Sequence, residues 1–484
     1  MNRRVAVFFS MVVLLNLIYN ALLPLHFDEA YYWVWSKHLQ LSYFDHPPMI
    51  AWLIRMVTFW ADSEWIIRLV PLVCSSLTGL GIWRMAADLF DCKVADKALL
   101  LFALSPLAQL GFSLATPDAP LILGWTFGLL FAGRAIFGPN RRYYYLAGLA
   151  GGFALLSKYT AVLLLPGLFG FLIFSAYRSE LRRKEPWLAI GLACLTFVPV
   201  IVWNSGHGWS SFLFQLNHGF AGQRTLNPQT FFEYLGVHAV GLGPVFFLLF
   251  LYLLFWHLRT ILADEKQSFL LWPCLTVLFF FGYAALFKRA EGNWAAPAYV
   301  SGVVLLARWL KLPPYVRIYK IGIVMGVALT MLLKTPELFD FLPAKVVMKR
   351  QVLGYDELFQ GAGAYLQPPR QVLAADYKLA SLAWYYLPGQ PEVQVLTPSR
   401  FSQYTYWRQG RIGPAGSDAI YFGYETELAA LTELFEQVTP LPPLMYQGRY
   451  ISRTIQVYDC RGFRPTAALW SSRPPFGLAP WPFR

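Results

Sequence analysis

Long apolar stretches separated by short charged segments constrain this sequence more than any other feature. Hydrophobic residues make up 57% of the chain and charged residues only 14%, against roughly 25% charged in an ordinary soluble domain. Such a stretch can cross a bilayer as a helix when it holds close to 20 residues. The sequence predicts about 11 crossings, over residues 5–23, 66–87, 98–115, 121–137, 145–156, 161–177, 187–202, 235–256, 269–287, 295–310 and 321–333.

The positions of Lys and Arg set the predicted orientation. Asn2-Arg3-Arg4 precedes the first span, and later basic clusters such as Arg141-Arg142 and 182–184 fall on the same side. Because short cytoplasmic loops are enriched in Lys and Arg, we expect a cytoplasmic amino terminus and a periplasmic carboxyl end in a bacterial inner membrane. This clustering accounts for the net charge of +13 without a nucleic-acid partner. A cleavable signal peptide is the alternative for the first span, but no small-x-small cleavage site follows it.

The composition changes after Lys334, which predicts a membrane domain over 1–334 and an extracytoplasmic soluble domain over 335–484. Apolar runs beyond this point are too short to span a membrane. We expect a small α/β domain there, and its last dozen residues form an irregular tail. Residues 372–375 and 419–422 are expected as buried strands, 377–387 and 425–438 as helices, and 449–458 as an edge strand or hairpin arm.

An acidic motif, His26-Phe-Asp-Glu-Ala30, follows the first span directly. Asp28 and Glu29 open a predicted amphipathic helix at the membrane surface, and a second such helix begins at Pro47-Pro48. Ionisable groups at a membrane boundary are candidates for function. Asp28 could also serve as the helix N-cap, and the two roles are compatible.

A second pair of charges lies in turns between later spans. Asp118 belongs to the tight turn Thr116-Pro-Asp-Ala-Pro120, and Lys158 lies between two short spans. The two could form a charge pair, which we favour because an unpaired charge in such a place is costly. Alternatively, Asp118 could bind a divalent metal. The sequence indicates no other cofactor, and His26, His38 and His46 fit no metal-ligand spacing that we know.

Together these motifs resemble the GT-C fold glycosyltransferases that use lipid-phosphate sugars. They resemble most the family 39 group of protein O-mannosyltransferases, lipid A aminoarabinose transferases and Rgt-type galacturonosyltransferases. The resemblance covers the chain up to the end of the last predicted span. It rests on Asp28-Glu29, on Tyr43-Phe-Asp-His-Pro-Pro48 as an aromatic-x-x-Pro-Pro element, on Thr116-Pro-Asp118 and on Leu156-Ser-Lys158. One departure is His46, because the aminoarabinose transferases have Lys before the double proline.

The resemblance implies an integral membrane enzyme that moves a sugar from a polyprenyl phosphate to an acceptor hydroxyl, with inversion, on the outer face of the membrane. The acceptor would be lipid A, a polysaccharide or a protein. Asp28 would be the general base, and Glu29 would hold the helix start or a sugar hydroxyl. The other candidate residues for binding the substrates are Tyr32, Asp45, His46, Arg55, Asp118, Lys158, Lys288 and Arg289.

Some of these roles have competing interpretations. Lys288, Arg289 and Arg55 would bind the donor phosphate, although Arg55 could equally reach toward the lipid headgroups. Tyr32 and its aromatic neighbours could stack on a sugar or form an interfacial aromatic belt.

Two other classes of protein compete with an enzyme. A transporter or lipid flippase would show matched half-helices broken at the midplane, and the sequence shows none. A receptor would bind its ligand through the tail and use the spans only to signal. Release of polyprenyl phosphate from a polyprenyl-phosphate sugar would exclude both classes.

Overall fold

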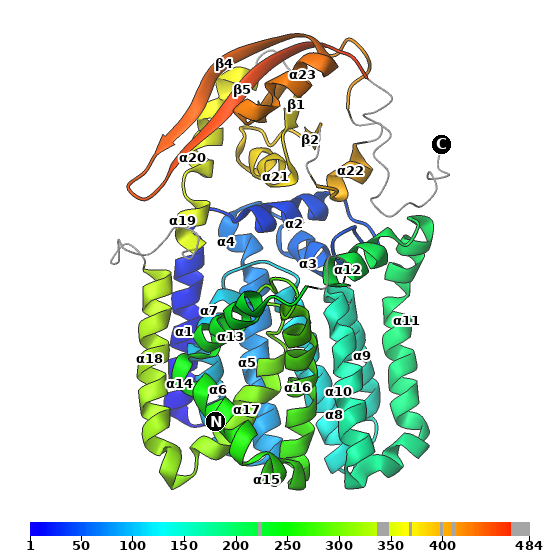
Figure 1. Cartoon of the computed structure of the whole chain (residues 1–484), viewed down its shortest axis with the longest axis vertical. Coiled ribbons are helices and arrows are strands. Elements are labelled where there is room, and N and C mark those ends of the chain that lie inside the picture. Colours follow the sequence, from blue (N-terminus) through cyan, green and yellow to red (C-terminus); the bar gives the residue numbers. More distant parts are fainter. Residues whose placement is uncertain (221–224, 336–347, 367–369, 397–399, 409–411, 466–484) are drawn as a thin grey trace.

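The computed structural model describes residues 1–220, 225–335, 348–366, 370–396, 400–408 and 412–465. A bundle of long helices forms one part of the molecule, and a domain with a five-stranded sheet covers one end of this bundle (Figure 1). Short helices of the first loop lie between the two parts. This arrangement matches the predicted membrane domain followed by a small α/β domain.

The bundle is built from apolar helices that coincide with the predicted spans. Each predicted range lies largely within one or two of these helices. The helices are α1 (Arg3–Ala21), α5 (Leu69–Leu89), α6 (Cys92–Leu104), α7 (Pro106–Gly111), α8 (Asp118–Phe137), α9 (Tyr143–Ser157), α10 (Leu164–Phe174), α11 (Lys184–Gly206), α13 (Pro228–Leu242), α14 (Pro244–Trp256), α16 (Glu265–Ala285), α17 (Ala298–Leu310) and α18 (Val316–Lys334).

Six helices in the described part of the chain are long and apolar enough to cross a membrane, or eight if each of two bent pairs is one span. The figure of about 11 crossings therefore stays a prediction. The predicted span over 235–256 is divided between α13 and α14, which meet at an angle of 114°. The break lies at Gly243, whose φ of +95° suits glycine, and Pro244 follows it without an N–H to continue the helix.

Helices α2 (Phe27–Lys37), α3 (Met49–Val57) and α4 (Glu64–Ile67) form the first loop after α1. The predicted helix that opens with Asp28 and Glu29 is α2. All of its residues from Glu29 to Ser36 are buried, because the sheet domain covers the face that the sequence pattern leaves to water. Helix α3 keeps an exposed side, which carries Arg55.

The sheet domain has the strand order β2-β1-β3-β5-β4. The first three strands are parallel, and β5 runs antiparallel to both β3 and β4. The strands are β1 (Gln371–Ala374), β2 (Val393–Val395), β3 (Ala419–Gly423), β4 (Phe435–Gln447) and β5 (Ser452–Phe463), and the helices are α19 (Met348–Val352), α20 (Tyr355–Gln360), α21 (Tyr377–Tyr386), α22 (Gln403–Trp407) and α23 (Leu428–Leu434).

Most predicted elements of this domain are confirmed. Strands β1 and β3 and helix α21 match their predicted ranges within a few residues, and 449–458 falls largely in β5, one arm of a hairpin with β4. The predicted helix over 425–438 is too long. Helix α23 ends at Leu434, and Phe435 starts β4 by pairing with Phe463. The predicted irregular tail lies outside the described residues, and the predicted domain boundary after Lys334 stays a prediction.

A continuous apolar core joins α2 to the sheet domain. Trp33 of α2 packs against Trp384 and Tyr385 of α21, with ring centroids 6.4 and 5.0 Å apart. The backbone N–H of Leu25 donates to the Tyr386 hydroxyl at 2.6 Å. The sheet domain is thus docked on the segment that carries the predicted acidic motif.

Candidate active site

The start of α2 leaves the Asp28 side chain free for chemistry. His26 is the N-cap, because its Nδ1 accepts a hydrogen bond from the Asp28 N–H at 3.3 Å. The capping role considered for Asp28 is therefore wrong. The Asp28 side chain is 36% exposed, and its Oδ2 lies 3.6 Å from His26 Nδ1. A carboxylate that is not needed for the helix can exchange a proton with a substrate.

Burial raises the pKa of Asp28 above its ordinary value, although the nearby charges of His26, Lys378 and Arg400 act to lower it. A carboxylate with a raised pKa is a stronger base than an exposed aspartate, provided that it stays ionised at the working pH. This environment suits the predicted general base.

Glu29 holds the local structure together. It is fully buried, and Arg68 donates to both of its oxygens at 3.0 and 2.7 Å. The N–H groups of His26 and Ala115 also donate to this carboxylate, at 2.9 and 3.0 Å. Of the two predicted roles, holding the helix start fits this geometry, since each oxygen already accepts two hydrogen bonds.

Arg68 was not among the predicted site residues. It also donates to the carbonyl oxygens of Leu23 and Pro24, at 2.6 and 2.7 Å. It thereby fixes the end of α1 against the start of α5. The available signal was a positive charge inside the predicted apolar span 66–87, which is costly unless it has a partner.

Asp45 connects α2 to the sheet domain. Its carboxylate accepts a hydrogen bond from the Tyr31 hydroxyl at 2.8 Å and pairs with Arg400. The Tyr31 hydroxyl in turn accepts one from the Gln403 N–H at 2.7 Å. Burial raises the pKa of Asp45, and the Arg400 charge partly offsets this rise.

Tyr32 lies among the acidic groups. Its side chain is buried, and this burial, together with the negative charges of Asp28, Asp45 and Asp118, raises its pKa well above the ordinary value. The ring of His46 lies 6.4 Å from that of Tyr32. The structure therefore brings four predicted residues around Tyr32, although they come from three separate segments.

The predicted pair of Asp118 and Lys158 is present. Lys158 Nζ donates to Asp118 Oδ1 at 2.8 Å, and the two side chains are 9% and 12% exposed, respectively. Asn293 donates to the other oxygen, Oδ2, at 2.7 Å. Within the described residues, no group of three or more His, Cys, Asp or Glu side chains is placed to hold a metal ion. This geometry favours the pair over the metal.

The three predicted phosphate-binding cations are not gathered around Asp28. Arg55 lies on the exposed side of α3. Arg289 is 74% exposed and lies 3.9 Å from Glu291. Lys288 is half-buried, which lowers its pKa, and Asn293 of the same loop donates to Asp118.

The cations beside Asp28 come from the sheet domain instead. Lys378 Nζ lies 4.4 Å from the centre of the Phe27 ring. Arg400 lies 5.1 Å from the centre of the Tyr377 ring, and that ring lies 4.8 Å from the ring of Tyr31. No local sequence signal marks these residues, because only the docking of the two domains brings them to α2.

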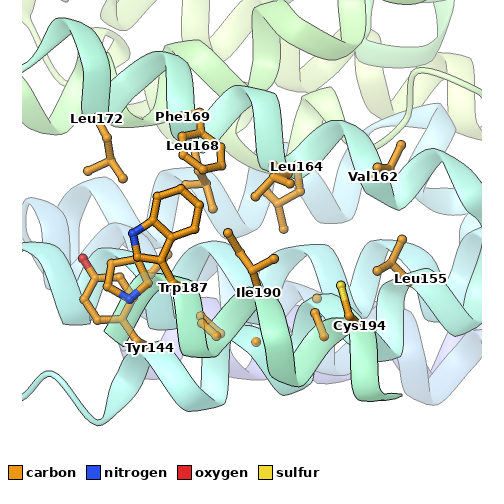
Figure 2. Close-up of a pocket in the computed structure, with 18 of the residues that line it drawn as sticks. Tyr144, Leu155, Val162, Leu164, Leu168, Phe169, Leu172, Trp187, Ile190 and Cys194 are labelled. Carbon is orange, nitrogen blue, oxygen red and sulfur yellow. The ribbon is translucent and has the colours of Figure 1, made fainter. Parts of the chain in front are cut away.

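The bundle also contains an apolar cavity of about 220 Å³. Figure 2 shows side chains of α10, such as Leu164 and Leu168, facing Trp187 and Ile190 of α11. Leu155 and Val162, which flank the Lys158 turn in sequence, also line it. This lining suits hydrocarbon and does not suit sugar chemistry.

Comparisons with known proteins agree with this fold. A family model described as dolichyl-phosphate-mannose-protein mannosyltransferase matches residues 45–203. The chain is 25% identical over 446 residues to the lipid A galacturonosyltransferase RgtD of Rhizobium johnstonii, covering 89% of this chain and 92% of that protein.

Solved structures resemble the whole chain. ArnT of Cupriavidus metallidurans, in its apo state, superposes with a TM-score of 0.66 at 13% identity over 93% of this chain and 97% of ArnT. The same protein bound to undecaprenyl phosphate gives the same score at 14% identity. An oligosaccharyltransferase of Archaeoglobus fulgidus gives 0.53 at 12% identity, over 85% of this chain and 67% of that one. At these identities the likeness concerns the fold.

The fold and the matches in sequence indicate a membrane glycosyltransferase of the GT-C type. The family model over residues 45–203 and the relative in sequence agree with this class, and the fold is similar to that of ArnT. The resemblance that rests on the acidic motifs and the double proline is thereby confirmed.

Proposed function

We propose that this protein transfers a sugar from a polyprenyl phosphate to an acceptor hydroxyl on the outer face of the membrane, with inversion at the anomeric carbon. One observation carries the proposal. Asp28 is a partly exposed carboxylate with a raised pKa. Its side chain does not cap α2, and the charges of Lys378 and Arg400 act on it.

In the proposed reaction, the acceptor oxygen forms a bond to the anomeric carbon while Asp28 takes the hydroxyl proton. The bond between that carbon and the phosphate oxygen breaks, and polyprenyl phosphate leaves with the bonding electrons. A single displacement of this kind inverts the anomeric centre. Proton transfer to a positioned base contributes roughly 10²–10⁴-fold to the rate, and cations fixed near the leaving phosphate stabilise its developing charge.

Three observations support a lipid-linked donor. The family model is named for a dolichyl-phosphate sugar, and ArnT of the same fold was solved with undecaprenyl phosphate. The apolar cavity between α10 and α11 offers a surface for a polyprenyl chain, and it adjoins the turn that carries Lys158.

The proposed sugar and acceptor are inferred from those of the relative in sequence. RgtD is named a lipid A galacturonosyltransferase, so we propose galacturonate and lipid A as the first pair to test. A polysaccharide or protein acceptor would use the same site chemistry.

The test uses the purified protein in lipid nanodiscs with labelled polyprenyl-phosphate galacturonate and lipid A. The expected result is release of polyprenyl phosphate together with labelled lipid A, and loss of both products in Asp28→Asn. Movement of intact donor across the membrane of proteoliposomes, without release of polyprenyl phosphate, would support the flippase alternative and overturn the proposal.

A further inference from the structure

Apart from His26, whose Nδ1 caps α2 and lies 3.6 Å from Asp28 Oδ2, the first loop supplies little positive charge to the proposed base. Lys37 forms an ion pair with Asp62, with 2.6 Å between Nζ and Oδ2. Arg68 is buried against Glu29, and Arg55 lies on the exposed side of α3. A donor that carries a phosphate therefore needs cations from another part of the chain.

Lys378 is one such cation. It is the second residue of α21, it is exposed, and its ammonium lies against Phe27, the residue that precedes Asp28. Its charge is among those that act on Asp28. Across the described ranges, no carboxylate lies within ion-pair distance of Lys378. An ammonium held in this way can accept an anion without giving up a partner.

Arg400 is the second cation. It pairs with Asp45, and its guanidinium lies 5.1 and 5.5 Å from the ring centres of Tyr377 and Phe214. The side chain remains 46% exposed. A guanidinium has five N–H donors in a planar fork that matches carboxylate and phosphate groups, and Asp45 and the Tyr377 hydroxyl engage only part of that fork.

The charges of the site require such cations. The carboxylates of Asp28 and Asp45 are close enough to affect each other's protonation. Lys158 already forms an ion pair with Asp118. Without cations that remain available, an anionic donor would be repelled by the carboxylate that must act as base.

We propose that Lys378 and Arg400 bind an anionic group of the lipid-linked donor, which makes the sheet domain part of the donor site. The group is either the donor phosphate or a carboxylate on the transferred sugar, and both present the same chemistry. This inference rests on the proposed function.

The experiment compares the full-length protein with Lys378→Met, Lys378→Arg and the control Arg464→Met. Arg464 is a cation of the same domain that lies 3.6 Å from Glu436, on β4, the outer strand of the hairpin. Three quantities are measured: the Kd for undecaprenyl phosphate alone, and the KM and kcat for polyprenyl-phosphate galacturonate. Melting temperatures show whether each variant is folded.

We expect Lys378→Met to weaken donor binding by roughly 10- to 100-fold, the range for losing a hydrogen bond to a charged group. Lys378→Arg should largely restore binding, and Arg464→Met should match the parent. If the phosphate is the group bound, the Kd for undecaprenyl phosphate rises. If it is a sugar carboxylate, that Kd stays unchanged and only the KM for the galacturonate donor rises.

Unchanged Kd and KM in a folded Lys378→Met protein would overturn the inference and leave the proposed function standing. A parent protein that neither binds undecaprenyl phosphate nor turns over the donor would overturn the proposed function itself. Arg400→Lys gives a second variant that keeps the pair with Asp45 while losing the planar fork, and its KM should rise with little change in melting temperature.

Discussion

Arg400 and Asp45 form an ion pair although 355 residues separate them in the sequence. Asp45 belongs to the first loop and Arg400 to the sheet domain, so this pair crosses the contact between the two parts. Tyr31 and Gln403 add a hydrogen bond of 2.7 Å beside it. The candidate active site is therefore shared by both domains.

Asp28→Asn should abolish transfer without unfolding the protein. The substitution keeps the shape of the side chain and removes the base, and the cap at His26 does not depend on the Asp28 side chain. We expect the rate to fall by roughly 10²–10⁴-fold, with a melting temperature close to that of the parent. Turnover near the parental rate in a well-folded variant would rule out Asp28 as the base.

The activity should be lost on the acidic side at a pH above that expected for an exposed aspartate. Asp28 acts as a base only when ionised, and burial raises its pKa, so protonation begins at a higher pH. The positive charge of Lys378 lowers the pKa of Asp28, and removing it should move the acidic limb of kcat/KM to still higher pH. An acidic limb at the same pH or lower in Lys378→Met would contradict this assignment.

Asp118 and Lys158 should show strong coupling. Each of Asp118→Asn and Lys158→Met leaves an unpaired charge or a broken hydrogen bond in a buried place, which costs about 3–5 kcal/mol for a buried pair. The double variant should lose less stability than the sum of the two. The measurement is a double-mutant cycle of thermal unfolding, with donor turnover followed in parallel.

A chelator distinguishes the ion pair of Asp118 and Lys158 from the alternative in which Asp118 binds a metal. We expect no effect of chelator on the parent, because both oxygens of Asp118 already have partners. Additive losses in the cycle, together with chelator sensitivity that added divalent ion reverses, would favour the metal.

Glu29→Gln should destabilise the protein far more than it affects binding of a sugar. The change removes the charge that Arg68 needs in a buried site, which again costs about 3–5 kcal/mol. Glu436→Gln, at an exposed pair on the sheet domain, should leave the melting temperature unchanged. A stable Glu29→Gln protein with a raised KM would instead indicate contact with the substrate.

The orientation can be tested with reporter fusions. A reporter fused after Lys334 or at the carboxyl end should be active only outside the cytoplasm, and one fused near Arg183 only inside, because the basic clusters mark the cytoplasmic side. Reporters active on the same side would mean that the number of crossings between these positions is even and that the predicted count is wrong.

Features set by short stretches of sequence could be predicted, and contacts between distant segments could not. The apolar spans, α2 and strands β1 and β3 follow from local periodicity, which is read within each segment. The pair of Asp118 and Lys158 could be predicted because both charges lie in turns where an unpaired charge is costly. The end of α23 was misplaced because the apolar spacing around Phe435 fits a helix as well as a strand.

The cations that the sheet domain brings to Asp28 could not be predicted in this way. Lys378 and Arg400 lie in segments with no motif, and they reach α2 only because Trp33 and Leu25 give the sheet domain a surface on which to dock. The predicted cations Arg55 and Arg289 have the right charge, but nothing in their local sequence fixes where they lie relative to Asp28.

The docking of α21 on α2 also has a consequence for the order of events during synthesis. Asp28 is made about 350 residues before Lys378, and Arg400, the second sheet-domain cation that acts on its pKa, is made later still. Ribosomes would have inserted every span before the last groups of the site emerge. A chain that stalls or is cut before Lys378 would carry the proposed base without either of these cations, so the newly made protein would stay inactive until the sheet domain has folded onto the first loop.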